Sequence, residues 1–84
     1  MGGGLSPRDR QLLDFERAWD AHAGHKLQAI GVTFSISPAR YYQLLSRLID
    51  DPAAESYDPL TVRRLRRRRA DRELRATRRA LQRR

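Results

Sequence analysis

The sequence predicts an all-α protein: a small three-helix bundle with a helix-turn-helix, followed by a basic C-terminal helix. Apolar residues recur three and four positions apart, as in amphipathic helices, and no segment shows the alternation of a half-buried strand. Serine or aspartate stands directly before proline at Ser6, Ser37 and Asp58, which is a signal for the start of a helix. With 84 residues, the chain is long enough for one small domain.

The first predicted helix runs from about Pro7 to His22. A glycine-rich lead-in over residues 1–5 precedes it and is expected to be flexible, and Gly24 ends the helix. Phe15 and Trp19 lie four residues apart on its inner face, so both are expected in the core.

Two shorter helices are predicted in the middle of the chain. In the segment HKLQAIGVTF, we expect Leu27, Ile30 and Phe34 to point inward, although Gly31 weakens this helix. The next helix is predicted from Pro38 to about Asp50. Its apolar stripe consists of Tyr41, Leu44, Leu45, Leu48 and Ile49.

The end of the chain is predicted to form a separate basic helix. The stretch DDPAAESYDP is rich in acidic and turn residues and is expected to form a loop, with the preceding helix halted ahead of Pro52. The last helix then starts at Pro59 and continues into the arginines. The predicted organisation is a flexible N-terminus at 1–5, a helix-turn-helix domain at 6–57 and an arginine-rich helix or arm at 58–84.

The segment AIGVTFSISPARYYQLL has the outline of a helix-turn-helix, with two short helices and a serine cap on the second. Ala29 is small enough for the helices to cross closely, and Ile36 is expected to plug the turn. Tyr41 and Leu45 are expected beneath the second helix. Residues Thr33–Ser35 are expected to form the turn. An ordinary helical bundle fits this pattern equally well.

The outer face of the second helix is the candidate recognition surface. It starts at Ser37 and would meet base edges in the major groove. Gln43 can pair with adenine, an arginine with guanine or phosphate, and a tyrosine with sugar or phosphate. The candidate DNA-binding residues on this face are Ser37, Pro38, Ala39, Arg40, Tyr42, Gln43, Ser46 and Arg47.

Charge is distributed unevenly along the chain, whose formal net charge is +8. Residues 63–84 hold twelve arginines and two acidic residues, a balance of +10, whereas residues 1–62 have a balance of −2. A neutral head with a strongly cationic tail is typical of proteins that bind a polyanion, and favours DNA binding over an ordinary bundle. The residues predicted to contact the DNA phosphate backbone are Arg63, Arg64, Arg66, Arg67, Arg68 and Arg69. Residues 72–84 are expected to be frayed and to supply only nonspecific positive charge.

Other roles for the tail have weaker support in the sequence. Leu60, Leu65, Leu74 and Leu81 form only a thin apolar seam, too narrow for a helix that lies on a membrane surface. The seven-residue spacing of the last two leucines could pack against another chain, but two residues are weak evidence for a coiled coil.

Several classes of function are not expected. The chain has no cysteine, so thiolate metal sites and disulfides are excluded, and His22 and His25 are interpreted as exposed loop residues. The carboxylate pairs Asp14 with Glu16 and Asp50 with Asp51 are interpreted as helix-surface charges and cap neighbours. We therefore expect no enzyme activity, cofactor or small-molecule substrate. No apolar run is long enough to span a membrane, so the predicted location is the cytoplasm, at the nucleoid.

Three stretches occur in an order that resembles a known family: LLDFERAW, ARYYQLLSRLID with a proline after it, and DPLTVRRLRRRR. Over roughly residues 10–70 the chain is similar to small actinobacterial helix-turn-helix proteins catalogued as a domain of unknown function. These proteins look like nucleoid-associated DNA binders. The block RYYQ is matched by Arg40, Tyr41, Tyr42 and Gln43, and the basic RLR segment by Arg63, Arg64 and Arg66. Asp20 departs from the aromatic residue expected beside Trp19.

The resemblance and the charge pattern together imply a protein that binds double-stranded DNA and organises the chromosome or regulates transcription. Residues 38–50 would enter the major groove, and the arginine-rich helix would lie on the phosphate backbone or in a minor groove. A homodimer, or several copies along the DNA, would raise the affinity. Two alternatives remain open: a protein-interaction module that docks on the transcription machinery, and an RNA- or ribosome-binding protein.

Overall fold

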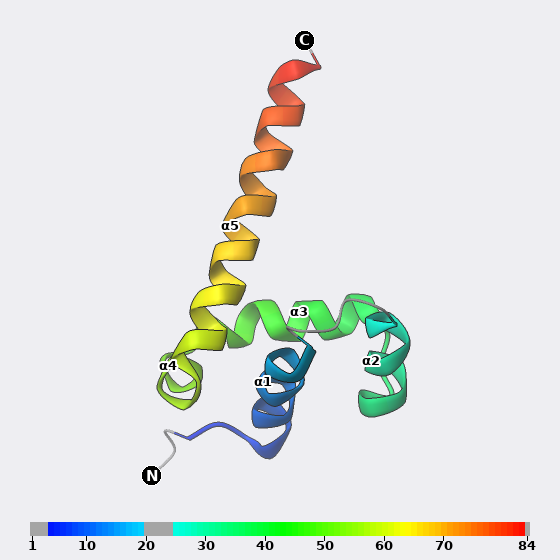
Figure 1. Ribbon diagram of the computed structural model, residues 1–84, viewed down its shortest axis with the longest axis vertical. Helices are drawn as coiled ribbons and strands as arrows, with labels where there is room; N and C mark the ends of the chain where they lie inside the picture. The colour runs from blue at the N-terminus through cyan, green and yellow to red at the C-terminus, as the bar shows by residue number, and fades with distance from the viewer. Residues whose placement is uncertain (1–3, 20–24, 84) are drawn as a thin grey trace.

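The computed structural model describes residues 4–19 and 25–83, and this part of the chain is helical without strands. The helices are α1 Pro7–Trp19, α2 Lys26–Phe34, α3 Pro38–Leu48, α4 Pro52–Tyr57 and α5 Pro59–Gln82 (Figure 1). The all-α prediction is confirmed. The arrangement differs from a three-helix bundle, because four short helices form a body from which α5 projects (Figure 1).

A serine or aspartate caps the helix that begins at each proline of the chain. Backbone N–H groups donate to the side-chain oxygens of Ser6, Ser37, Asp51 and Asp58 at 2.9–3.2 Å. Proline suits the first position of a helix because its missing N–H would have had no partner there. The prediction of a loop at DDPAAESYDP is therefore wrong: residues 52–57 form α4, and Asp51–Pro52 starts a helix like the other three pairs.

The core lies where α1, α2, α3, α4 and the base of α5 meet. Its most buried apolar side chains are Leu12, Leu13, Ile30, Tyr41, Ala54 and Val62. Phe15 and Phe34 add two half-buried rings beside Tyr41, with ring centroids 5.3–5.8 Å apart. Leu5 is also buried, at 8% exposure, so the predicted flexible lead-in contributes its last residue to the core.

Some boundaries and orientations differ from the prediction. Trp19 is half-buried against Phe15, with ring centroids 5.8 Å apart. The predicted end of the first helix at His22, its stop at Gly24 and the departure at Asp20 lie outside the described residues. Leu27 was expected to point inward but is 58% exposed on α2.

The turn between α2 and α3 is formed by Ser35, Ile36 and Ser37, whereas Thr33 belongs to α2. Ser35 has a φ of 56°, the left-handed conformation in which such turns usually place glycine. This conformation ends α2 and lets Ile36 pack against the core as expected. Compared with the predicted turn at residues 33–35, the turn is shifted by two residues towards α3.

The last helix has two distinct halves. Thr61, Val62 and Leu65 are buried at its base, whereas every described residue from Ala70 onward is exposed. The outer half stands clear of the body (Figure 1), and the longest dimension of the molecule is 51 Å. The prediction that residues 72–84 are frayed is wrong as far as Gln82, where α5 ends.

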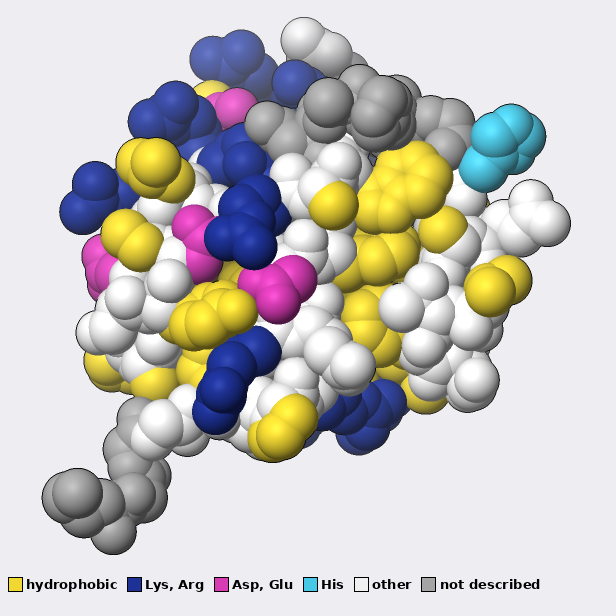
Figure 2. Space-filling model, turned by 60° about the horizontal axis from the view of Figure 1, so that its bottom comes forward, with side chains coloured by type: hydrophobic (Ala, Val, Ile, Leu, Met, Phe, Trp, Pro, Cys, Tyr) yellow, Lys and Arg dark blue, Asp and Glu magenta, His cyan; other side chains and the backbone are white. Residues whose placement is uncertain are grey.

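The face of the body on the side opposite the outer half of α5 has mixed charge. Figure 2 shows basic and acidic side chains interspersed there, with an apolar band beside His25. This face therefore offers no continuous cationic surface.

Candidate nucleic-acid interface

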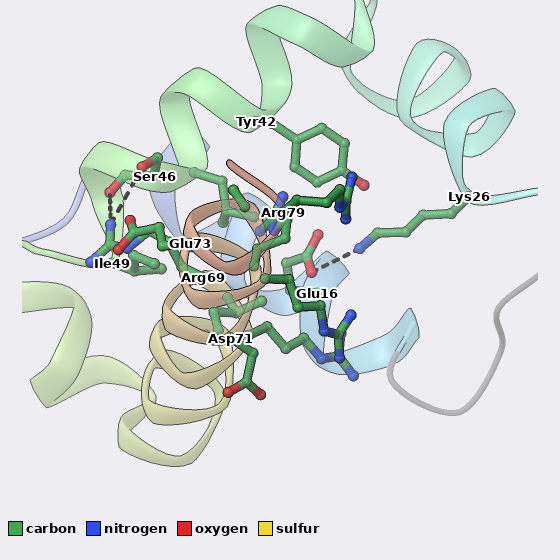
Figure 3. A pocket seen from close by; sticks show the side chains of 15 residues that line it. Glu16, Lys26, Tyr42, Ser46, Ile49, Arg69, Asp71, Glu73 and Arg79 are labelled. Carbon is green, nitrogen blue, oxygen red and sulfur yellow. Dashed lines mark hydrogen bonds and ion pairs between the residues drawn. The ribbon is translucent and has the colours of Figure 1, made fainter. Parts of the chain in front are cut away.

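A groove of about 940 Å³ lies in the corner between α3 and α5 (Figure 3). We call it the corner groove. The α3 wall comprises Tyr42, Leu45, Ser46 and Ile49, and the α5 wall includes five arginines: Arg68, Arg69, Arg72, Arg75 and Arg79. Lys26 adds a further cation, and Glu16, Asp71 and Glu73 are the acidic lining residues. The lining is therefore cationic on balance.

Three of the arginines predicted to contact the DNA phosphate backbone attach α5 to the body. Arg64 donates to the backbone carbonyl of Glu16 at 3.1 Å. Arg66 donates through Nε to the carbonyl of Ile49 at 2.7 Å, and through Nη1 to Glu55 at 3.3 Å. These contacts join α5 to α1, to the end of α3 and to α4. The guanidinium groups of Arg64 and Arg66 thus make contacts within the fold, and their DNA contacts stay a prediction.

Arg69 makes the strongest of these attachments. Its two terminal nitrogens donate to the two carboxylate oxygens of Asp50 at 2.7 and 3.1 Å, a bidentate pair. It also donates to the backbone carbonyl of Ser46 at 3.1 Å (Figure 3). The hydrogen bond from Arg69 lowers the pKa of Asp50 below its usual value, and the same bond raises the pKa of Arg69. This pair joins α5 to the end of α3, and DNA binding by Arg69 stays a prediction.

The remaining predicted arginines lie on different sides of α5. Arg63, Arg67 and Arg68 are exposed, but only Arg68 lines the corner groove. Arg68, Arg72, Arg75 and Arg79 follow one another at spacings of four, three and four, so they share one helical face. We call this set the arginine face. Arg72, Arg75 and Arg79 were not predicted as site residues. They share a face with Arg68 only if residues 68–79 form one continuous helix.

The predicted recognition surface on α3 is only partly available. Arg40, Gln43 and Arg47 are exposed, as are the small residues Pro38 and Ala39. Arg40 donates to the side chain of Gln43 at 3.4 Å. This part of α3 therefore presents two cations and an amide to solvent, as the sequence predicts.

Other members of that surface have structural contacts. The Ser37 hydroxyl accepts the hydrogen bond from the Arg40 backbone N–H at 3.1 Å, and the Ser46 hydroxyl lies 3.4 Å from Arg69. Tyr42 is half-buried: its ring packs edge-on against Tyr41 at 5.0 Å, and the ammonium group of Lys26 lies 5.6 Å from its centroid. Tyr42 is thus a wall of the corner groove and not a freely projecting side chain.

A buried polar network supports that wall. Glu16 is 2% exposed and accepts hydrogen bonds from the Tyr41 hydroxyl and, at 2.9 Å, from Lys26 (Figure 3). Burial, followed by the hydrogen bond to Glu16, raises the pKa of Tyr41 far above its ordinary value. The prediction that Glu16 is a helix-surface charge is wrong. Its carboxylate joins α1, α2 and α3 beneath Tyr42.

The described residues contain no group of three or more His, Asp or Glu side chains placed to hold a metal ion. His25 is exposed, and His22 lies outside the described residues. In the described part of the chain, every helix is too short or too polar to cross a membrane.

Comparison with known proteins gives one match. The sequence model of a family described as "Protein of unknown function (DUF3263)" matches residues 4–80. The searches of curated proteins and of solved structures found no match.

Proposed function

Because the chain belongs to the DUF3263 family of unknown function, we propose its function from geometry and charge: it binds double-stranded DNA in the corner between α3 and α5. The arginine face of α5 would lie along phosphates, and the exposed face of α3 would enter the major groove. In this proposal α2, the turn at Ser35–Ser37 and α3 act as a helix-turn-helix.

The observation that carries the proposal is the arginine face. Arg68 and Arg79 are eleven residues apart, which spans about 16 Å along a helix. Arginine forms bidentate hydrogen bonds with phosphate, and duplex DNA presents about one charge per 1.7 Å of its axis. A row of four guanidinium groups on one face is therefore suited to a phosphate backbone. The α5 helix holds this row beside α3, because Arg69 anchors it to Asp50.

The exposed residues of α3 supply the candidate base contacts. Gln43 can form two hydrogen bonds with adenine, and Arg40 or Arg47 can do so with guanine. All three are exposed, lie on the side of α3 that is not packed on the core, and lie outside the lining of the corner groove. We propose that these contacts give a modest sequence preference, while the arginine face supplies most of the affinity. Such a division of roles suits a nucleoid-associated protein that also influences transcription.

The salt dependence of binding tests the phosphate contacts. If the four arginines of the face act together with Arg40 and Arg47, log affinity should fall against log salt with a slope of about −5. Fluorescence anisotropy with a labelled duplex of about 20 base pairs, two helical turns, measures this slope. A slope smaller than about 2 in magnitude would overturn the proposal.

A pair of matched variants tests the location of the site. Arg72→Gln/Arg79→Gln removes two charges from the arginine face, and Arg63→Gln/Arg67→Gln removes two exposed arginines from the other side of α5. At about 0.1 M salt each lost phosphate contact weakens binding by about tenfold. We expect about a 100-fold loss for the first variant and a much smaller loss for the control. Equal losses would show that only total charge matters and would refute the proposed site.

Structured RNA is the competitor that decides the class of nucleic acid. The deep, narrow major groove of A-form RNA does not admit an α-helix, so α3 should contribute nothing to RNA binding. We therefore expect tighter binding to duplex DNA than to an RNA hairpin of equal length in the same titration. Tighter binding to the RNA would replace this proposal with RNA recognition.

A further inference from the structure

The outer half of α5 has no support from the body. All described residues from Ala70 onward are exposed, and most of the charges along this segment are arginines. Like charges four residues apart destabilise a helix, and short helices without tertiary packing are marginal in water. A continuous helix to Gln82 therefore suggests that this segment packs against something else.

Apolar and small side chains line one face of this segment. Ala70, Leu74, Thr77 and Leu81 follow one another at spacings of four, three and four, which is the pattern of the core positions of a coiled coil. We call these four residues the seam. Leu74 and Leu81 are 50% and 63% exposed. The Thr77 hydroxyl donates to the Glu73 carbonyl at 3.0 Å, so its polar group is already paired within the helix. Leu65, which the sequence places with these leucines, is instead in the core.

The acidic residues of α5 flank the seam. Asp71 and Glu73 occupy the two positions that border the core of a coiled coil, called e and g. In a parallel pair of helices, each g residue faces the e residue five positions further along the other chain. Glu73 then faces Arg78 of a second copy. In an antiparallel pair with the seam aligned, Glu73 would face Ala80 and Asp71 would face Arg78, so only the parallel pair uses Glu73.

We propose that the outer half of α5 pairs in parallel with the same segment of a second copy, through the seam and the Glu73–Arg78 contacts. The pairing is weak and depends on concentration, because the seam spans only about two heptads and Arg67 occupies the core position before it. Leu60 and Arg67, on the same side of α5, are exposed.

The pairing determines how a dimer would hold DNA, a consequence that rests on the proposed DNA binding. Arg72 and Arg79 each precede a seam leucine by two residues, which places them about 200° around the helix from it. The arginine faces of the two copies therefore point away from each other. A dimer would hold two duplexes, one on each side, and would bridge DNA instead of binding two half-sites of one duplex.

Sedimentation of the full chain tests the seam. Leu74→Asn/Leu81→Asn should abolish a self-association that the unmodified protein shows at micromolar concentration. The matched control, Leu27→Asn/Val32→Asn, changes two exposed apolar residues of α2 that are 58% and 80% exposed. It should associate like the unmodified protein. An unmodified protein that stays monomeric at about 100 μM, beyond the range of typical weak pairs, or equal association in both variants, would overturn the proposal.

A charge swap tests the parallel orientation. Glu73→Arg places like charges opposite each other twice in each parallel dimer and should weaken association by about tenfold. Glu73→Arg/Arg78→Glu reverses the pair, keeps the net charge and should restore association. If Glu73→Arg has no effect, the parallel orientation is wrong.

A DNA-bridging assay distinguishes a failure of the proposed pairing from a failure of the proposed DNA binding. Beads that carry one duplex should retain a second, labelled duplex only when the protein can pair. If Leu74→Asn/Leu81→Asn binds a single duplex normally but no longer bridges, both proposals are supported. If the protein self-associates without binding DNA, the function falls and the pairing stands. If it binds DNA but neither pairs nor bridges, the pairing falls alone.

Discussion

Replacing Tyr41 by phenylalanine should weaken the fold through a single buried hydrogen bond. The Tyr41 side chain is fully buried, and its hydroxyl donates to the carboxylate of Glu16, which is 2% exposed. Phenylalanine keeps the ring and its contacts with Phe15 and Phe34. The substitution therefore removes one donor from a buried carboxylate that keeps Lys26 as its remaining partner.

The expected loss follows from the strength of hydrogen bonds to charged groups. Such bonds contribute about 1.5–3 kcal/mol, so Tyr41→Phe should lower the free energy of unfolding by about 2 kcal/mol. In a domain of this size, that loss lowers Tm by about 10 °C. Trp19 is the only tryptophan and is half-buried on α1, so its fluorescence reports unfolding of the body in urea.

Tyr57→Phe provides a matched control. Tyr57 also donates its hydroxyl to a carboxylate, that of Asp14 at 2.9 Å, but this contact is exposed. Its loss should leave the unfolding midpoint unchanged within error, because water replaces the missing donor. If Tyr41→Phe changes the free energy of unfolding by less than about 0.5 kcal/mol, or no more than Tyr57→Phe does, the buried network does not stabilise the body.

The same pair predicts a pH dependence. Burial raises the pKa of Tyr41 above its ordinary value of 10.0, so the folded state retains the proton where the unfolded state releases it. The stability from Tyr41 is fully present below pH 10 and declines as the pH rises above that value. The difference in stability between the unmodified protein and Tyr41→Phe should therefore narrow above pH 10. A difference that stays constant up to pH 11 would contradict this reasoning.

Three further substitutions test other parts of the structure. Asp51→Ala removes the cap that accepts from the Ala53 backbone N–H and should cost about 1 kcal/mol in urea unfolding; an unchanged midpoint would show that α4 does not need its cap. Gly31→Ala should stabilise the protein by about 0.5–1 kcal/mol, because Gly31 is exposed in α2 and an added Cβ meets nothing within 4 Å; a loss of stability would contradict the geometry of α2. Gln43→Ala should reduce the preference among DNA sequences in competition binding while nonspecific affinity is kept, and an unchanged preference would exclude Gln43 from base contacts.

The starts of the helices were predictable because their signals are local. Ser6, Ser37 and Asp58 each cap a helix whose first residue is the next one along the chain. The error at Asp51 has a physical explanation: a proline can both stop one helix and start the next. The short α4 is stabilised by tertiary packing, since Ala54 is fully buried in the core.

The candidate site was predictable in composition but not in geometry. The excess of arginine in residues 63–84 identified α5, yet Arg64, Arg66 and Arg69 bind groups on α1, α3 and α4. Their acceptors lie between 11 and 48 residues away in the sequence. The number of arginines therefore could not show which of them bind the body and which are exposed on the surface of α5. Residues 72–84 were predicted to be frayed, so Arg72, Arg75 and Arg79 were not among the predicted site residues.

By itself, the sequence determined the helical class, three of the four cap–proline helix starts and the separation of a neutral head from a cationic tail. These properties depend on residue type and on neighbours a few positions away. Only the tertiary structure decided that Glu16 is buried and that Arg69 anchors the corner. It also decided that the arginine face and the seam lie on opposite sides of an exposed helix. Burial, pairing and the direction of a face depend on which distant residues meet in space, and short-range patterns do not contain that information.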